Sequence, residues 1–267
     1  MIEMLLGVIE GMPQSYATAP RMASPRPFDV WTRLVQDRAM EFFWVVETRR
    51  SVRKYLPEPV DAAVVEKAID AALLAPNSSN LQTWEFHWVR SEPRRAALIE
   101  ACLNQNAART SQHLIVAVAN PTLWKKHVEA ILAQADQANA PAIVRQYYQK
   151  LIPLLYGWAW LAPLKWLLFN VVGFMRPISR RPWSRRDVDE ISIKSTALAC
   201  ENFMLAITAQ GYDTCPMEGF DERRVKKLLG LSCRARVVMV ISVGKRDPKG
   251  LWGERFRVPR DWVVKTV

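Results

Sequence analysis

The sequence predicts a fold that mixes α-helices and β-strands, and three observations support this. Apolar residues recur at helical spacing in several segments, among them residues 61–74 and 193–210. Shorter apolar runs at 114–119 and 237–243 have the length and composition of buried strands. The 10 glycines form no G-x-G-x-x-G pattern, which argues against a dinucleotide-binding Rossmann unit.

The N-terminal residues differ in composition from the rest of the chain. Residues 1–6 lack the positive charges and the long apolar core of a secretory signal. Residues 17–27 are rich in small residues, proline and arginine. We therefore expect a poorly ordered lead-in over residues 1–30 and a single domain over 31–267, because a chain of 267 residues can bury one good core. The first helix is predicted over 31–46 from its helical spacing.

The next elements follow from caps and periodicity. Asp61 is the predicted N-cap of a helix that ends at Leu74 before Pro76. Its apolar stripe consists of Val64, Val65, Ala68, Ile69, Ala72 and Leu73. A strand is predicted over 84–90, with Phe86 and Trp88 on one face, then a helix over 94–104 and a buried strand over 114–119.

The last third of the chain gives the clearest signals. Residues 193–210 are apolar almost all round, which predicts a central helix that ends at Gly211. Asp221 is expected to cap a helix over 222–229, and Gly230 to close it. Residues 237–243 are predicted to form a core strand.

Charge and cysteine content limit the classes of partner. The net charge is +11, but no helix-turn-helix, zinc finger or RNA-binding pattern organises it, so we expect no nucleic-acid partner. An anionic cofactor or an anionic membrane surface is the better match. Four cysteines without a C-x-x-C pair favour reduced thiols in the cytoplasm, and three scattered histidines argue against a metal site.

Two polar motifs carry the strongest functional signal. Arg49, Arg50, Ser51 and Arg53 place three guanidinium groups and a hydroxyl within five residues. Residues 75–84, A-P-N-S-S-N-L-Q-T-W, place short amides and hydroxyls directly after a predicted helix. Such groups suit a planar, anionic, hydrogen-bonding cofactor, for which flavin mononucleotide (FMN) is the obvious candidate.

These two motifs and four further segments, taken together in their order along the chain, resemble those of the FMN-dependent nitroreductase family. The further segments are Asn104 before the strand-like segment 113–119, the helix 192–211, the segment 216–221, and Arg255 and Arg257 before Pro259. The resemblance covers roughly residues 47–121 and 190–267. It implies an α+β sandwich, in which helices surround a central antiparallel sheet, and a homodimer with flavin sites at the subunit interface.

The resemblance also implies roles for individual residues. Arg49, Ser51, Arg255 and Arg257 would approach the phosphate and ribityl end of FMN, Arg53 the pyrimidine edge, and Glu218 and Gly219 the surroundings of flavin N5, with no side-chain nucleophile. The turn formed within residues 75–84 would reach the flavin of the partner subunit. The full candidate set is Arg49, Arg50, Ser51, Arg53, Pro76, Asn77, Ser78, Asn80, Gln82, Asn104, Pro216, Met217, Glu218, Gly219, Arg255 and Arg257.

Several of these residues have an alternative, purely structural explanation. A lone arginine is usually a solvated surface charge, and Asn77, Ser78 and Asn80 are common in turns that stop helices. Asn77 also stands where the family has serine. Asn106 is an alternative to Asn104. The segment 218–221 also fits a turn that leads into a capped helix.

The predicted function is that of an FMN-dependent oxidoreductase. NADH or NADPH would be the electron donor, and nitroaromatic, quinone or similar conjugated apolar compounds the acceptors, in a ping-pong hydride mechanism. The alternatives are a reductive dehalogenase or a flavin-fragmenting enzyme of the same superfamily, or a membrane-docking protein in which FMN is structural or absent.

The resemblance leaves one hydrophobic and arginine-rich segment unexplained. We call this segment, at about residues 121–190, the central insert. Residues 151–175 are long enough to cross a bilayer, but Lys165 would cost roughly 3 kcal/mol near its centre. A single crossing would also put the two halves of the flavin site on opposite sides. Two alternatives remain open for 151–186, namely a lid or dimer arm that caps an apolar acceptor, and peripheral membrane docking by a cytoplasmic protein through its arginines at 176–186.

Overall fold

The computed structural model describes residues 41–267. The lead-in expected over 1–30 and the part of the first helix expected over 31–40 lie outside the described residues. A helix over 41–48 runs two residues past the predicted end at Val46 and leads into the Arg49–Arg53 motif.

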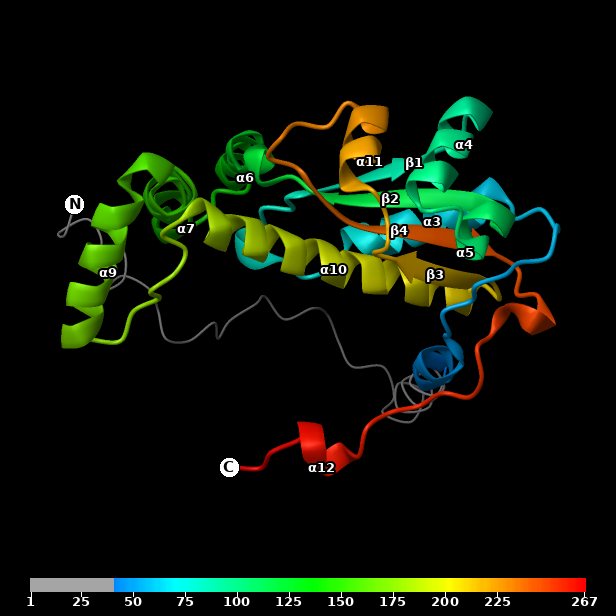
Figure 1. Ribbon diagram of the computed structural model, residues 1–267. Coiled ribbons are helices and arrows are strands. Elements are labelled where there is room, and N and C mark those ends of the chain that lie inside the picture. Colours follow the sequence, from blue (N-terminus) through cyan, green and yellow to red (C-terminus); the bar gives the residue numbers. More distant parts are fainter. Residues whose placement is uncertain (1–40) are drawn as a thin grey trace, which may run out of the picture.

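Four strands form one antiparallel sheet in the order β1-β2-β4-β3 (Figure 1). The strands are β1 Trp84–Trp88, β2 His113–Ala119, β3 Asp213–Met217 and β4 Arg236–Gly244. The three predicted strands are confirmed as β1, β2 and β4, whereas β3 was not predicted. The register of the β2–β4 pair shifts between Ala117 and Val118, because β4 carries one extra residue, Val238, at a bulge.

Both faces of the sheet are apolar, so helices cover both. In β2, Leu114, Val116 and Val118 point into one core, and Ile115 and Ala117 into the other, as the two-residue period of a strand requires. The first core contains α4 (Glu92–Ala101), α5 (Asn106–Thr110) and α11 (Glu222–Leu229). The second contains α3 (Ala62–Leu73) and α10 (Arg185–Ala209), which runs the length of the sheet on the side opposite α4 and α11 (Figure 1). The predicted α+β sandwich is confirmed.

Local capping explains where most helices begin and end. Asp61 accepts a hydrogen bond from the backbone N–H of Ala63 and starts α3, although Leu73 at its end is 46% exposed rather than in the core. Both bounds of α11 are as predicted, with Gly230 in the left-handed conformation that closes it. The helix predicted over 94–104 occupies Glu92–Ala101, which leaves Asn104 on the following turn.

Helix α10 begins at Arg185 rather than at residue 193. Ser184 accepts a hydrogen bond from the backbone N–H of Asp187, and the Asp187 carboxylate accepts one from the N–H of Ser184. This capping box lets two polar turns precede the apolar part of the helix.

The central insert is helical and extends beyond one end of the sandwich (Figure 1). Its elements are α6 (Trp124–Gln137), α7 (Ala142–Gln146), a π-helical turn (Tyr147–Leu151), α8 (Ile152–Tyr156), a 3-10 turn (Ala159–Leu161) and α9 (Ala162–Met175). Further 3-10 turns are Ser78–Asn80, Pro121–Leu123 and Pro248–Gly250, and α12 (Arg260–Val263) lies near the C-terminus. Within residues 41–267, no helix combines the length and the apolar character that crossing a bilayer requires.

Lys165 is buried at 2% exposure between α8 and α9. Its ammonium donates hydrogen bonds to the carbonyl oxygens of Leu154 at 3.0 Å and Gly157 at 2.9 Å. These are carbonyls at the end of α8, which the helix itself leaves without partners. Lys165 therefore fixes α9 against α8 and does not interrupt the outer face of α9.

Candidate functional site

The Arg49–Arg53 motif is held by backbone hydrogen bonds at the β3 edge of the sheet. The N–H of Val52 donates to the carbonyl of Thr214 at 3.0 Å, and that of Arg53 to the carbonyl of Gly250 at 2.8 Å. The Val52 side chain is fully buried. This anchor places the guanidinium groups beside the C-terminal segment of the chain.

Cationic side chains from both ends of the described chain meet here. Arg255 donates hydrogen bonds to the carbonyl oxygens of Arg49 and, at 3.4 Å, Val46. Arg50 donates to the carbonyl of Gly253 at 2.8 Å. Burial and the nearby positive charges of Arg257, Arg49 and Arg50 lower the pKa of Arg255. We call Arg49, Arg50, Arg255 and Arg257 the arginine cluster.

The arginine cluster has little negative charge to balance it. Among residues 41–267, its one salt bridge joins Arg49 Nε to Glu201 of α10 at 3.9 Å, a long contact. Like charges that repel one another are held together most easily when an anion binds between them. The cluster therefore fits a phosphate group.

Arg53 lies at the other side of the motif, beside a cavity of about 280 Å³. The ring of Trp252 stacks against its guanidinium, 4.3 Å from the ring centre. The lining residues are Arg53, Lys54, Gln105, Asn106, Ala107, Lys249 and Trp252. Nearby, burial raises the pKa of the Cys215 thiol, although the positive charges of Arg53 and Arg49 act in the opposite direction.

The segment 216–219 and the loop that holds Asn104 also meet at this site. Pro216 and Met217 end β3, and Glu218 and Gly219 leave the sheet. The side-chain amide of Gln105 donates to the carbonyl of Gly219 at 2.6 Å. A Cβ atom at Gly219 would come within 3.3 Å of this amide nitrogen, a tight contact that a side chain there would relieve only by shifting the Gln105 amide.

The turn 76–82 belongs to a different neighbourhood. Ser78 N–H donates to Ser195 Oγ of α10 at 3.4 Å, and Tyr156 of α8 donates to Ser78 Oγ at 3.4 Å. Ser79 bonds to the hydroxyl of Tyr147 at 2.6 Å. Within residues 41–267, none of the hydrogen bonds of the turn leads to the arginine cluster.

The turn itself is conformationally constrained. Ser79, Asn80 and Gln82 adopt positive φ angles of 56°, 51° and 48°, which non-glycine residues rarely do. The Asn77 amide oxygen accepts a hydrogen bond from the N–H of Gln82 at 2.8 Å. The Asn77 side chain thus closes the turn from inside, which is the structural role that turn chemistry predicts.

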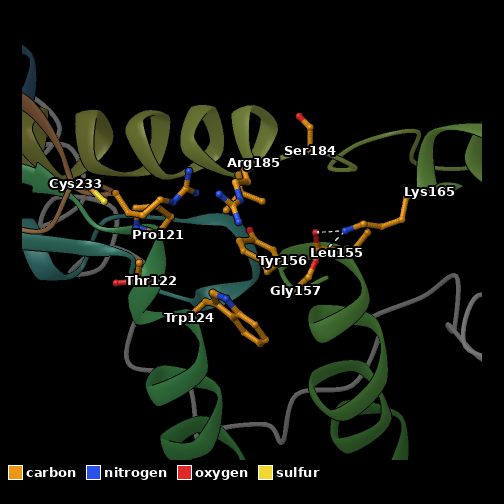
Figure 2. Close-up of a pocket in the computed structure, with 12 residues that line it drawn as sticks. Pro121, Thr122, Trp124, Leu155, Tyr156, Gly157, Lys165, Ser184, Arg185 and Cys233 are labelled. Atoms are coloured by element: carbon orange, nitrogen blue, oxygen red, sulfur yellow. Dashed lines mark hydrogen bonds between the residues drawn. The ribbon is translucent and has the colours of Figure 1, made fainter. Parts of the chain in front are cut away.

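A further cavity of about 340 Å³ lies at the base of the central insert (Figure 2). Trp124, Tyr156, Lys165, Arg185 and Cys233 are among its lining residues. It contains no residue of the two motifs, so it is separate from the candidate site.

Sequence reasoning missed Gln105 and Trp252. Gln105 stands between the candidates Asn104 and Asn106, so the correct part of the chain was identified. Its role depends on a contact with Gly219, 114 residues later, which the sequence does not reveal. Trp252 gave no local signal except an aromatic residue close to a run of cations.

Known proteins resemble this chain over most of its length. The model of the nitroreductase family matches residues 46–245. The protein DrgA of Synechocystis is 30% identical over 78% of this chain and 85% of that protein. A 4-nitrobenzoate reductase of Pseudomonas putida is 27% identical over 83% of this chain and 92% of that enzyme.

Two solved structures share the fold. YdfN of Bacillus subtilis superposes with a TM-score of 0.68 at 23% identity, over 86% of this chain and 100% of that one. A protein of Exiguobacterium sibiricum, crystallised in complex with FMN, superposes with a TM-score of 0.64 at 22% identity, over 85% of this chain and 97% of that one.

Proposed function

Because the chain belongs to the nitroreductase family, we propose that it is an FMN-dependent oxidoreductase that uses NADH or NADPH. Its acceptors in this proposal are nitroaromatic, quinone or similar conjugated apolar compounds. The relative that reduces 4-nitrobenzoate and the solved structure with FMN support this assignment. The observation that carries it is the arginine cluster, which unites residues of both ends of the described chain around a site suited to a phosphate.

The residues present fit FMN in two respects. The arginine cluster offers several guanidinium groups with one salt bridge within residues 41–267, although Glu47 lies near Arg255, and such groups pair with phosphate in a bidentate manner. Apart from the Gln105 amide and the adjacent residues of the chain, no atom of the described residues lies within 4 Å of the place where a Cβ of Gly219 would be, so a flat ring can approach the backbone there. When bound, FMN would supply the hydride chemistry, first reduced by the nicotinamide and then oxidised by the acceptor.

Each side chain then has a distinct task. Arg49, Arg50, Ser51, Arg255 and Arg257 would hold the phosphate and ribityl end. Arg53 would face the pyrimidine edge, where a fixed positive charge stabilises the negative charge of the reduced ring. Asn104, or Asn106 in the cavity wall, would bond to the ring edge.

The segment 216–219 would pass over the reactive part of the ring. In this proposal Pro216 and Met217 bring the chain there from β3, Gly219 presents its backbone N–H, and Glu218 orders a water or a proton source.

We also propose that the active unit is a homodimer. Within the described chain, the turn residues Pro76, Asn77, Ser78, Asn80 and Gln82 share no hydrogen bond with the arginine cluster of their own subunit. In this proposal they serve the flavin of a partner. Apolar side chains along several elements support a second copy, because a monomer would leave them in water. They include Phe42, Phe43, Trp44, Leu73, Leu74, Ile193, Leu198, Phe256 and Trp262.

Purification tests the proposed cofactor directly. The protein is expected to be yellow, to release FMN on denaturation, and to bleach under NADH or NADPH without oxygen. Multiple turnover should follow when a soluble quinone is added. A colourless protein that does not take up added FMN would contradict the proposal and favour a membrane-docking protein without flavin chemistry.

A further inference from the structure

Helix α9 exposes an apolar face although it is already packed on its other side. Leu168 and Phe169 are buried against α8 together with Lys165. The opposite side carries the α9 stripe, which consists of Leu164, Leu167, Val171 and Phe174, 47%, 53%, 53% and 92% exposed. These positions are three or four residues apart, so they form one continuous face of the helix.

Three exposed tryptophans accompany the α9 stripe, two just before α9 and one within it. Trp158, Trp160 and Trp166 are 49%, 78% and 49% exposed. Tryptophan is enriched where apolar and aqueous phases meet, because its ring is apolar and its N–H is polar. The only charged side chain within α9, Lys165, points inward to the carbonyls of α8, so the outer face carries no charge.

The chain on both sides of α9 is rich in cations. Residues 137–186 contain no Asp or Glu and hold eight cations. Lys165 is buried, and Arg145 and Arg181 pair with carboxylates outside this range. Among the others are Lys150, Arg180, Arg185 and Arg186. Arg180 donates hydrogen bonds to Asn170 and Gly173, which fixes it beside the C-terminal half of α9.

Two of these arginines occupy positions that disfavour them. Arg185 and Arg186 are exposed in the first turn of α10, where the helix dipole repels positive charge. Neither forms a salt bridge with another residue of the described chain. Their cost to the helix is offset when an anionic surface lies opposite them.

We propose that α9 docks on the surface of an anionic lipid bilayer. The helix of 14 residues is about 21 Å long, too short to cross a hydrocarbon core of about 30 Å, but suited to lie in the interface. The stripe and the three tryptophans enter the boundary between headgroups and acyl chains, and the arginines contact lipid phosphates. A second copy of the chain is the poorer partner for this face, because it would bring the same cations together. The docking does not depend on the flavin assignment.

Flotation of the full-length protein with lipid vesicles tests this docking. The protein is expected to float with vesicles of phosphatidylcholine and phosphatidylglycerol in equal parts, and to stay largely unbound with phosphatidylcholine alone. The variant Leu167→Gln/Phe174→Gln removes apolar surface at unchanged charge and is expected to bind at least ~10-fold more weakly. Arg185→Gln/Arg186→Gln is expected to lose about fivefold in affinity for each arginine.

A matched control is available in the same insert. Ala130→Gln/Ala133→Gln changes two exposed positions of α6 and is expected to float like the wild type. Light scattering should show the same oligomeric mass for all variants. Three results would overturn the proposal: a wild type that ignores anionic vesicles, a Leu167→Gln/Phe174→Gln variant that floats normally, or a loss of oligomeric mass in that variant, which would assign the stripe to contact between copies.

Discussion

The side-chain amide of Gln105 and the carbonyl oxygen of Gly219 are joined by a hydrogen bond of 2.6 Å. This bond ties the loop after α4 to the segment after β3, and Gln105 also lines the cavity beside Arg53. Gln105 therefore holds the backbone of residues 218–219 in place without taking part in any bond-making step.

Substitution of Gln105 by Leu should affect the reductive half-reaction more than flavin retention. Loss of a hydrogen bond worth about 1 kcal/mol lets Gly219 shift, which we expect to slow flavin reduction by about fivefold or more. Stopped-flow measurement of reduction by NADPH, with FMN affinity determined in parallel, checks this. Gln134→Leu on the exposed side of α6 is the control. Equal reduction rates in Gln105→Leu and the wild type would show that Gln105 does not position this segment.

Substitution of Arg257 by Ala should weaken FMN binding. A charge-assisted hydrogen bond to phosphate contributes about 1.5–3 kcal/mol, which corresponds to a Kd raised by roughly 10- to 150-fold. Fluorescence titration of the apoprotein with FMN measures this. Arg260→Ala, an exposed arginine three residues further on, should retain wild-type affinity. Wild-type affinity in Arg257→Ala would remove Arg257 from the phosphate site.

Substitution of Leu198 by Glu should dissociate the proposed dimer. Leu198 is 49% exposed on α10 and lines a cavity with Pro76 and Ser78 of the turn. A carboxylate at an apolar subunit contact would lose its hydration, so we expect monomers that retain little flavin. Analytical ultracentrifugation and the flavin-to-protein ratio report both effects, with Ala133→Glu on α6 as control. A dimeric, flavin-loaded Leu198→Glu protein would place the interface elsewhere.

The capping box of α10 should make stability depend on pH in the acid range. Burial acts to raise the pKa of Asp187, but hydrogen bonds from Ser184 and Trp183, with the charge of Arg181, outweigh it and lower the pKa. The folded protein then binds this proton less tightly than the unfolded chain. The carboxylate therefore stabilises the fold above its unfolded pKa of about 3.9, and this contribution is lost as the pH falls through the folded-state pKa.

Urea denaturation of Asp187→Asn tests this linkage. We expect the variant to lose about 1 kcal/mol of unfolding free energy at neutral pH, and the difference from the wild type to shrink as the pH falls below about 3.9. Asp136→Asn, at a 67% exposed side chain, should show little effect at any pH. A difference between Asp187→Asn and the wild type that does not change with pH would mean that the charge of Asp187 contributes nothing.

The parts of the fold that depend on local chemistry could be predicted from the sequence. Helix α11 is an example, because both of its ends are set by adjacent residues, Asp221 and Gly230. Strand β3 was missed because Pro216 interrupts its pattern. The structure tolerates this proline since β3 is an edge strand, and its short bridge to Ser51 on the open side is made by Thr214 and not by Pro216. The start of α10 was missed although Ser184 and Asp187 have capping spacing, because the turns that follow are polar.

In the candidate site, too, features set by adjacent residues could be predicted and contacts between distant segments could not. The two motifs could be found in the sequence because their residues are neighbours. The stacking of Trp252 on Arg53 could not, since it joins segments about 200 residues apart and no pattern in either segment specifies the other. The inward direction of Lys165 also depends on where α8 ends, which periodicity alone did not reveal.

The tyrosine hydroxyls that support the turn predict that certain pairs of variants complement each other. Tyr147, Tyr148 and Tyr156 brace residues 78–79 from the insert of the same subunit. In the proposed dimer, the turn of one subunit completes the catalytic centre of the other. Loss of these tyrosine hydrogen bonds in one subunit should therefore impair the catalytic centre of its partner. Two impaired proteins, one with Phe at the three tyrosines and one with Arg257→Ala, should thus complement each other when their subunits are mixed at limiting FMN. Each hybrid would contain one centre that carries both defects and one that carries neither.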